Sequence, residues 1–337
     1  PISPVFAYNV IILLSFVACG LFMLKLALAK THNWPASLVA GLVFCIMPFR
    51  PPQLMAGHPN GVAVCFVPLT LYFISRAQTT GSLWVSLGAG LTYSSIALLD
   101  MQLAFFSAIL IALFTAYETI SNVIRNRTGT SWQKHVQWFF RWAIPMGVGV
   151  LPGVIYLGFM KLVVLKASAI HGSGSTRGRI GPLLEDLWDI TVCGERRIYF
   201  GPWVLALAIC GLILPALRRC RWRERLSHCA EPLFWGFLVL AGLALSLAMN
   251  PPFDRIMARI PMANFSRTPA RASIITFTGF PLLAAVALAS IRRLLGKRRA
   301  AQSAYLGLVA LVLLLVAHNY HLRGPRGINI IPETSPA

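Results

Sequence analysis

Apolar segments of membrane-spanning length constrain this chain more than any other feature of its sequence. A helix needs roughly 20 mostly apolar residues to cross the hydrocarbon core of a bilayer. The chain of 337 residues is 57% hydrophobic and only 12% charged, which a soluble domain could not bury inside itself. The candidate spans cover residues 5–28, 35–47, 61–75, 83–99, 101–120, 138–160, 201–217, 233–249, 272–291 and 305–317. We therefore expect an all-α, polytopic transmembrane bundle of about ten spans, with short interfacial helices in the outer loops.

The strong excess of basic residues does not indicate a nucleic-acid-binding protein. The chain has 30 Lys and Arg against 10 Asp and Glu, but the basic residues interrupt the apolar runs and form no continuous face. No Walker loop, GxGxxG fingerprint, CxxC or HExxH pattern is present. The sequence thus predicts membrane lipids as partners and no nucleic acid, and it leaves a divalent metal ion open without showing a site for one.

Three basic connections between spans set the expected orientation. They fall on one side of a ten-span bundle, and short loops rich in Lys and Arg face the cytoplasm. Their cations are Arg125, Arg127, Lys134, Arg141; Arg218, Arg219, Arg221, Arg223, Arg225; and Arg292, Arg293, Lys297, Arg298, Arg299. We expect residues 1–317 to form the transmembrane domain, with outer loops at 48–60, 161–200 and 250–271. Residues 318–337 would begin an outer C-terminal tail or a truncated domain.

Four arginines in the predicted outer loop 250–271 indicate that this loop binds an anion. Guanidinium groups bind phosphate through paired hydrogen bonds and keep their charge. Arg267 and Arg271 lie four residues apart at the outer mouth of the span 272–291, and we favour them as contacts to a lipid phosphate. Arg255 and Arg259 are also four apart, and we favour an interfacial helix that rests them on lipid headgroups.

Two other outer segments carry candidate site residues. Asp100 separates two spans, so it is either a general base or metal ligand or a solvated acid that caps the following helix. Arg50 and His58 lie in a proline-interrupted connection that cannot be one continuous helix. They either bind phosphate or sugar hydroxyls, or act as a headgroup contact and a helix cap. In the longest outer loop, residues 182–190 read as a short amphipathic helix in which Glu185 and Asp186 are more easily explained as solvated acids.

Several short motifs, in order along most of the chain, resemble the GT-C superfamily. The set is similar, more narrowly, to multispanning bacterial proteins of the YfhO-like and RgtA-like type. The motifs are Ala7-Tyr8-Asn9, Pro48-Phe49-Arg50 with Gly57-His58-Pro59, Val67-Pro68-Leu69, Gln102 after a span-ending turn, Ile198-Tyr199-Phe200-Gly201-Pro202 and Arg267-Thr268-Pro269-Ala270-Arg271.

The resemblance implies an integral membrane glycosyltransferase of the bacterial cytoplasmic membrane. It would transfer a sugar from a polyprenyl-phosphate donor on the outer face. The residues implied as donor-phosphate or acceptor contacts are Arg50, His58, Gln102, Arg267 and Arg271. A carboxylate would deprotonate the acceptor hydroxyl while arginines stabilise the charge that gathers on the lipid phosphate.

One departure from the superfamily concerns the catalytic acid. Members carry it in the first outer loop, after the first span, and this chain is expected to begin beyond that loop. Asp100 is the substitute candidate for the base, and a fragment that lacks the first loop is expected to be inactive.

Two other function classes remain open from the sequence. A lipid or polysaccharide transporter would favour paired charges near the membrane midplane, whereas Lys25 is the one charge that we place deep in a span. A non-catalytic membrane scaffold is the other alternative. Gly149 and Gly153, four residues apart, predict a close helix contact either within the chain or between chains, so the oligomeric state is not predicted.

Overall fold

Helices form all of the regular structure in the part of the chain that the computed structural model describes. That part comprises residues 3–48, 50–55, 57–125, 132–171, 202–217, 222–247, 255, 259, 269–296 and 298–323. The helices are α1 (Pro4–Thr31), α2 (Trp34–Cys45), α3 (Arg50–Met55), α4 (Asn60–Ala63), α5 (Phe66–Thr80), α6 (Leu83–Leu99), α7 (Met101–Arg125), α8 (Trp132–His171), α9 (Pro202–Ile213), η3 (Leu214–Leu217), α10 (Trp222–Ser246), η5 (Pro269–Ala272), α12 (Ser273–Leu295) and α13 (Arg299–Arg323).

Seven helical segments in the described residues are long and apolar enough to cross a membrane. They are Phe6–Thr31, Asn60–Thr80, Met101–Ile124, Gln133–Met160, Cys229–Ser246, Ser273–Leu295 and Arg299–His318. The predicted all-α integral membrane fold is thereby confirmed. The other predicted spans fall on three shorter apolar helices, Trp34–Cys45, Leu83–Leu99 and Pro202–Leu217, so the count of about ten is not confirmed.

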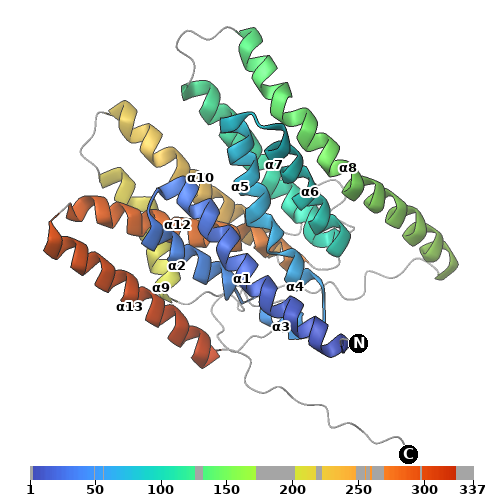
Figure 1. Ribbon diagram of the computed structural model, residues 1–337, viewed down its shortest axis with the longest axis horizontal. Coiled ribbons are helices and arrows are strands. Elements are labelled where there is room, and N and C mark those ends of the chain that lie inside the picture. Colours follow the sequence, from blue (N-terminus) through green and yellow to red (C-terminus); the bar gives the residue numbers. More distant parts are fainter. Residues whose placement is uncertain are drawn as a thin grey trace, which may run out of the picture.

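The helices pack side by side into a bundle (Figure 1). Its two ends are distinguished by the connections that lie there. At the first, which we call the site end, α6 stops at Leu99 and α7 begins at Met101. At the other, which we call the basic end, α5 stops at Thr80 and α6 begins at Leu83. Polar contacts fasten the basic end, where the Tyr305 hydroxyl donates to Asn33 Oδ1 at 2.9 Å. The basic end corresponds to the predicted cytoplasmic side, and the site end to the predicted outer side.

Helix α12 forms the centre of the C-terminal half. It is the most buried of the spanning segments, with 83% of its most apolar stretch enclosed by other helices, and it packs against α2, α9 and α10. Glycines permit this close packing, since a Cβ at Gly242 would lie 2.5 Å from Thr276 Oγ1. The N-terminus of α12 is thus held in the bundle, directly after the η5 turn that carries Arg271.

The outer loops differ in part from their predicted limits. Helix α8 has 40 residues and extends to His171, about 60 Å at 1.5 Å per residue, so residues 162–171 are helical and not loop. The apolar part of α8 that could cross a membrane ends at Met160, as predicted, and the helix continues beyond it through Lys161 and Lys166. Residues 48–60 are folded as predicted into separate pieces, α3 and the start of α4, with Gly57 at φ 76° between them. The predicted interfacial helix at 182–190 lies outside the described residues.

A contact of small residues joins α6 and α8 within the chain. The Ser94 hydroxyl donates to the Gly149 carbonyl at 2.8 Å and accepts from the Gly153 amide at 3.1 Å. A Cβ at Gly149 would lie 2.5 Å from the Leu87 carbonyl oxygen. The contact that the glycine spacing predicted is therefore intramolecular.

Replacing Gly149 with leucine should separate α6 from α8. Overpacking a close contact costs about 1–3 kcal/mol, so the apparent Tm of Gly149→Leu in detergent should fall. Gly147→Leu is the matched control, because a Cβ at Gly147 would meet nothing within 4 Å. Equal Tm values for the two variants would show that this contact does not hold α8.

A buried ion pair that the sequence analysis missed joins α1, α5 and α7. Lys30 Nζ donates to Glu118 Oε1 at 2.7 Å, and the Ser75 hydroxyl donates to Glu118 Oε2 at 3.0 Å. Both charged side chains are at most 10% exposed. Glu118 lies within the predicted span 101–120, so Lys25 is not the only charge inside a predicted span. The sequence signal for this ion pair is Glu118 itself, an acid inside an apolar run.

Removing one partner of this pair should destabilise the protein more than removing both. Glu118→Ala leaves the Lys30 charge buried, at a cost of about 3–5 kcal/mol, whereas apolar replacement of both partners is often close to neutral. We expect a marked loss of Tm in detergent for Glu118→Ala and recovery of most of it in Lys30→Met with Glu118→Leu. A double variant as unstable as the single one would contradict this account.

Candidate functional site

Asp100 connects α6 to α7 through its backbone and its side chain. Its amide donates to the Ile96 carbonyl at 2.8 Å, which completes α6. Its Oδ1 accepts from the Leu103 amide at 2.8 Å, the usual contact of a residue that caps a helix N-terminus. The predicted helix cap is present and fixes the carboxylate at the start of α7, but the carboxylate is not solvated as that interpretation expected, because the side chain is 8% exposed.

The carboxylate of Asp100 also forms an ion pair with Arg271. Arg271 Nη1 donates to Oδ1 at 2.8 Å and to Oδ2 at 2.7 Å. The side chains are 8% exposed for Asp100 and 18% exposed for Arg271. Opposite charges with so little access to water stabilise each other through short, charge-assisted hydrogen bonds. Two candidates that the sequence treated separately therefore form one site.

The pair lies where four elements meet at the site end. Arg271 belongs to η5, which packs against α7, α10 and α12. Pro269 begins this turn with a fixed φ, and α12 follows it directly. The guanidinium is consequently positioned between the start of two spanning helices, α7 and α12, both of which present N–H groups and the positive end of a helix dipole toward this end.

The hydrogen bonds of the pair define its remaining chemistry. An ionised carboxylate has about four acceptor directions, and the bonds above use two on Oδ1 and one on Oδ2. By this count, Oδ2 has one more acceptor direction than the bonds within the described residues use. The pairing with Asp100 employs only Nη1 of the guanidinium.

Arg50 is placed differently from the sequence-based expectation. Its side chain is fully buried, where Nε donates to the Gly61 carbonyl at 2.9 Å, Nη1 to the Cys45 carbonyl at 3.0 Å and Nη2 to the Ser15 hydroxyl at 2.8 Å. The guanidinium also lies 4.3 Å from the centre of the Phe16 ring. These contacts tie the middle of α1 and the C-terminal end of α2 to α4, a structural use of the side chain, and we leave Arg50 out of the proposed site.

His58 and Gln102 lie on separate elements of the site end. His58 is exposed in the connection between α3 and α4, and its amide donates to the Gln53 carbonyl at 2.9 Å. Beside it, Asn60 Nδ2 donates to Gln53 Oε1 at 2.9 Å in a buried amide pair that the sequence analysis missed. Gln102 is half-buried in the first turn of α7, two residues after Asp100.

Of the other three arginines in the predicted outer loop 250–271, the structure describes two. Arg255 and Arg259 are exposed, consistent with the headgroup interpretation. Arg267 lies outside the described residues, as do Glu185 and Asp186.

Metal binding finds no support in the described residues. No group of three His, Cys, Asp or Glu side chains there lies close enough to hold an ion. The candidate site thus consists of one carboxylate and one guanidinium that carry opposite charges.

Comparisons with known proteins add no relationship. No protein-family model matches the chain, and no curated protein matches it.

Arg50→Lys should destabilise the fold although the charge is retained. An ammonium group cannot reproduce the planar arrangement that reaches Gly61, Cys45 and Ser15 together. Loss of one or two hydrogen bonds to a charged donor corresponds to about 1.5–3 kcal/mol each. A lower apparent Tm in detergent is expected, with His58→Ala as an exposed control from the same connection. An unchanged Tm in Arg50→Lys would argue for a role other than structural.

Proposed function

We propose that the protein is an integral membrane glycosyltransferase that takes a sugar from a polyprenyl-phosphate donor at the site end, on the outer face of the membrane. The observation that supports this most directly is the sheltered Asp100–Arg271 pair. It combines a cation suited to a phosphate with an acid suited to a hydroxyl proton, at the edge of the apolar bundle. The motif resemblance supplies the reaction class.

In this proposal Arg271 binds the donor phosphate. The hydrogen bonds that it donates to Asp100 fix its guanidinium, so that little side-chain entropy is lost when a phosphate arrives. The N-termini of α7 and α12 add backbone dipoles that favour an anion at the same end. Arg267, four residues earlier in the sequence, supplies the second positive charge.

Asp100 acts in the proposal as the general base. The acceptor oxygen forms a bond to the anomeric carbon while the bond from that carbon to the phosphate oxygen breaks. The phosphate leaves with the bonding electrons, stabilised by Arg271. The hydroxyl proton moves to Asp100 Oδ2.

Donor binding and sugar transfer should respond differently to substitutions in the pair. Asp100→Asn retains a good helix cap, so it should preserve donor affinity within a few-fold and abolish most of the turnover. Arg271→Lys should weaken binding of polyprenyl phosphate by about tenfold or more, because hydrogen bonds to a charged group contribute about 1.5–3 kcal/mol. Arg259→Ala, an exposed arginine of the same loop, is the matched control.

The measurement uses the purified full-length protein in nanodiscs, with polyprenyl phosphate for binding and a labelled polyprenyl-phosphate sugar for transfer. If Asp100→Asn loses donor affinity but keeps its turnover at saturating donor, Asp100 acts only by positioning the arginine and is not the base. If Arg271→Lys binds as well as the unchanged protein, the proposed phosphate site is wrong.

A lipid or polysaccharide transporter is the second candidate, and the buried Lys30–Glu118 pair favours it, since intramembrane ion pairs are common in transporters. The pair lies toward the basic end and not beside Asp100 and Arg271. Consumption of the labelled donor separates the two functions, because transport leaves the glycosyl phosphate bond intact.

A further inference from the structure

The turn between α12 and α13 gathers positive charge at the basic end of the bundle. Arg292 and Arg293 lie in the last turn of α12, Arg298 directly precedes α13 and Arg299 begins it. All four side chains are exposed. Gly296, at φ 78°, lets the chain reverse between the two helices, because glycine adopts this conformation without strain. We call the four arginines the α12–α13 basic turn.

The helices around the basic turn supply no carboxylate to neutralise it. No Asp or Glu precedes Asp100 in the sequence, and none lies between Asp254 and Glu333. Helices α1, α2, α12 and α13 therefore contain no acid, and α9 contains none either. Helix α10 also packs on α12, but its two acids are matched in number by two arginines of the same helix. The ion pairs among the described residues lie elsewhere, so this charge can be balanced by a bound anion.

Contacts within the protein hold two of the arginines in place. The Arg292 guanidinium lies 5.4 Å from the centre of the Tyr305 ring of α13. Arg293 Nη2 donates to the Thr31 carbonyl at the end of α1 at 3.4 Å. Tyr305 in turn donates to Asn33 Oδ1, which joins α13 to the same α1–α2 connection. A guanidinium has five N–H donors, so both side chains keep donors for an anion and lose less entropy when one binds.

The surroundings of the basic turn favour a phospholipid as the source of that anion. The turn joins two segments long and apolar enough to cross a membrane, Ser273–Leu295 and Arg299–His318. Leu294 and Leu295, directly after the arginines, are 56% and 42% exposed. Trp34 begins α2, which packs on α12 and α13, and is also exposed; tryptophan prefers the headgroup region of a bilayer. Exposed apolar side chains beside exposed arginines match an acyl chain beneath a charged headgroup.

We propose that the α12–α13 basic turn binds the phosphate of an anionic phospholipid in the leaflet at the basic end. Arg292 and Arg293 contact the phosphate through charge-assisted hydrogen bonds. Arg298 and Arg299 add to the positive field that attracts it. The site is independent of the proposed transferase function, whose phosphate contact lies at the site end.

The affinity test titrates the purified full-length protein in detergent with phosphatidylglycerol or phosphatidylcholine and measures bound lipid by native mass spectrometry. Phosphatidylglycerol should bind more tightly. Arg292→Gln and Arg293→Gln should each weaken its binding about fivefold, which corresponds to about 1 kcal/mol for each cation near an anionic lipid. The matched controls are Arg76→Gln and Arg141→Gln, which remove exposed arginines of α5 and α8 and should leave the affinity unchanged.

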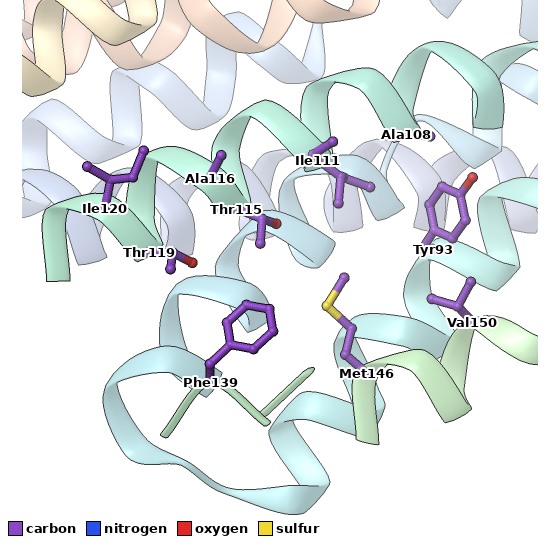
Figure 2. Close-up of a pocket in the computed structure, with 11 residues that line it drawn as sticks. Tyr93, Ala108, Ile111, Thr115, Ala116, Thr119, Ile120, Phe139, Met146 and Val150 are labelled. Carbon is purple, nitrogen blue, oxygen red and sulfur yellow. The ribbon is translucent and has the colours of Figure 1, made fainter. Parts of the chain in front are cut away.

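The position of the lipid is tested in nanodiscs with photoreactive acyl chains. Phosphatidylglycerol should label residues 292–305 more strongly than phosphatidylcholine does. A cavity of about 520 Å³ between α6, α7 and α8 serves as an internal reference (Figure 2). No charged side chain is among the residues that line it. An acyl chain that enters this cavity meets nothing that distinguishes the two headgroups, so both lipids should label it equally.

Three results would overturn the proposal. Equal weakening by the control substitutions would reduce the effect to a diffuse attraction of the whole basic end. Unchanged phosphatidylglycerol affinity in both Arg292→Gln and Arg293→Gln would move the lipid to another site. Displacement of phosphatidylglycerol by an equal concentration of inorganic phosphate would assign the turn to a soluble anion. All the substituted side chains are exposed, so the packing of the bundle should be retained in each variant.

Discussion

The hydrogen bonds between Asp100 and Arg271 connect residues that are 171 positions apart in the chain. Each charge has little access to water, and breaking such a pair by removing one partner costs about 3–5 kcal/mol. The η5 turn must therefore lie over the junction of α6 and α7, and α12 must enter the bundle beside α7. The position of the central helix of the C-terminal half and the geometry of the candidate site thus depend on the same contact.

The other buried polar groups follow the same physical rule at different places. The Arg50 guanidinium has two carbonyls and a hydroxyl as partners, and Lys30 has Glu118 and Ser75. In a membrane the protein itself must supply such partners. Apolar packing occupies the length of the bundle between them. The two ends differ: one holds a sheltered acid–arginine pair, and the other exposes Arg76, Lys134 and Arg141.

The sequence predicts the helices well because spanning runs are marked by composition alone, and each predicted span coincides with a helix at least in part. It also predicts that Asp100 ends a span and caps the following helix, as the structure has it, but not that the carboxylate is buried. It could not pair Asp100 with Arg271, since nothing local to either residue specifies a partner so distant in the chain. The sequence interpretation of Arg50 was a ligand contact, because two of its partners are backbone carbonyls, which residue types in a sequence do not reveal. Glu118 was missed although an acid within an apolar run requires a partner.

The position of the donor phosphate tests the central claim most directly. An electron cryomicroscopy map of the protein with polyprenyl phosphate in nanodiscs would locate it. The account predicts phosphate oxygens about 2.7–2.9 Å from the Arg271 guanidinium nitrogens, with Asp100 still bonded to Nη1. A phosphate bound elsewhere, with the Asp100–Arg271 pair unchanged and no lipid beside it, would contradict the account.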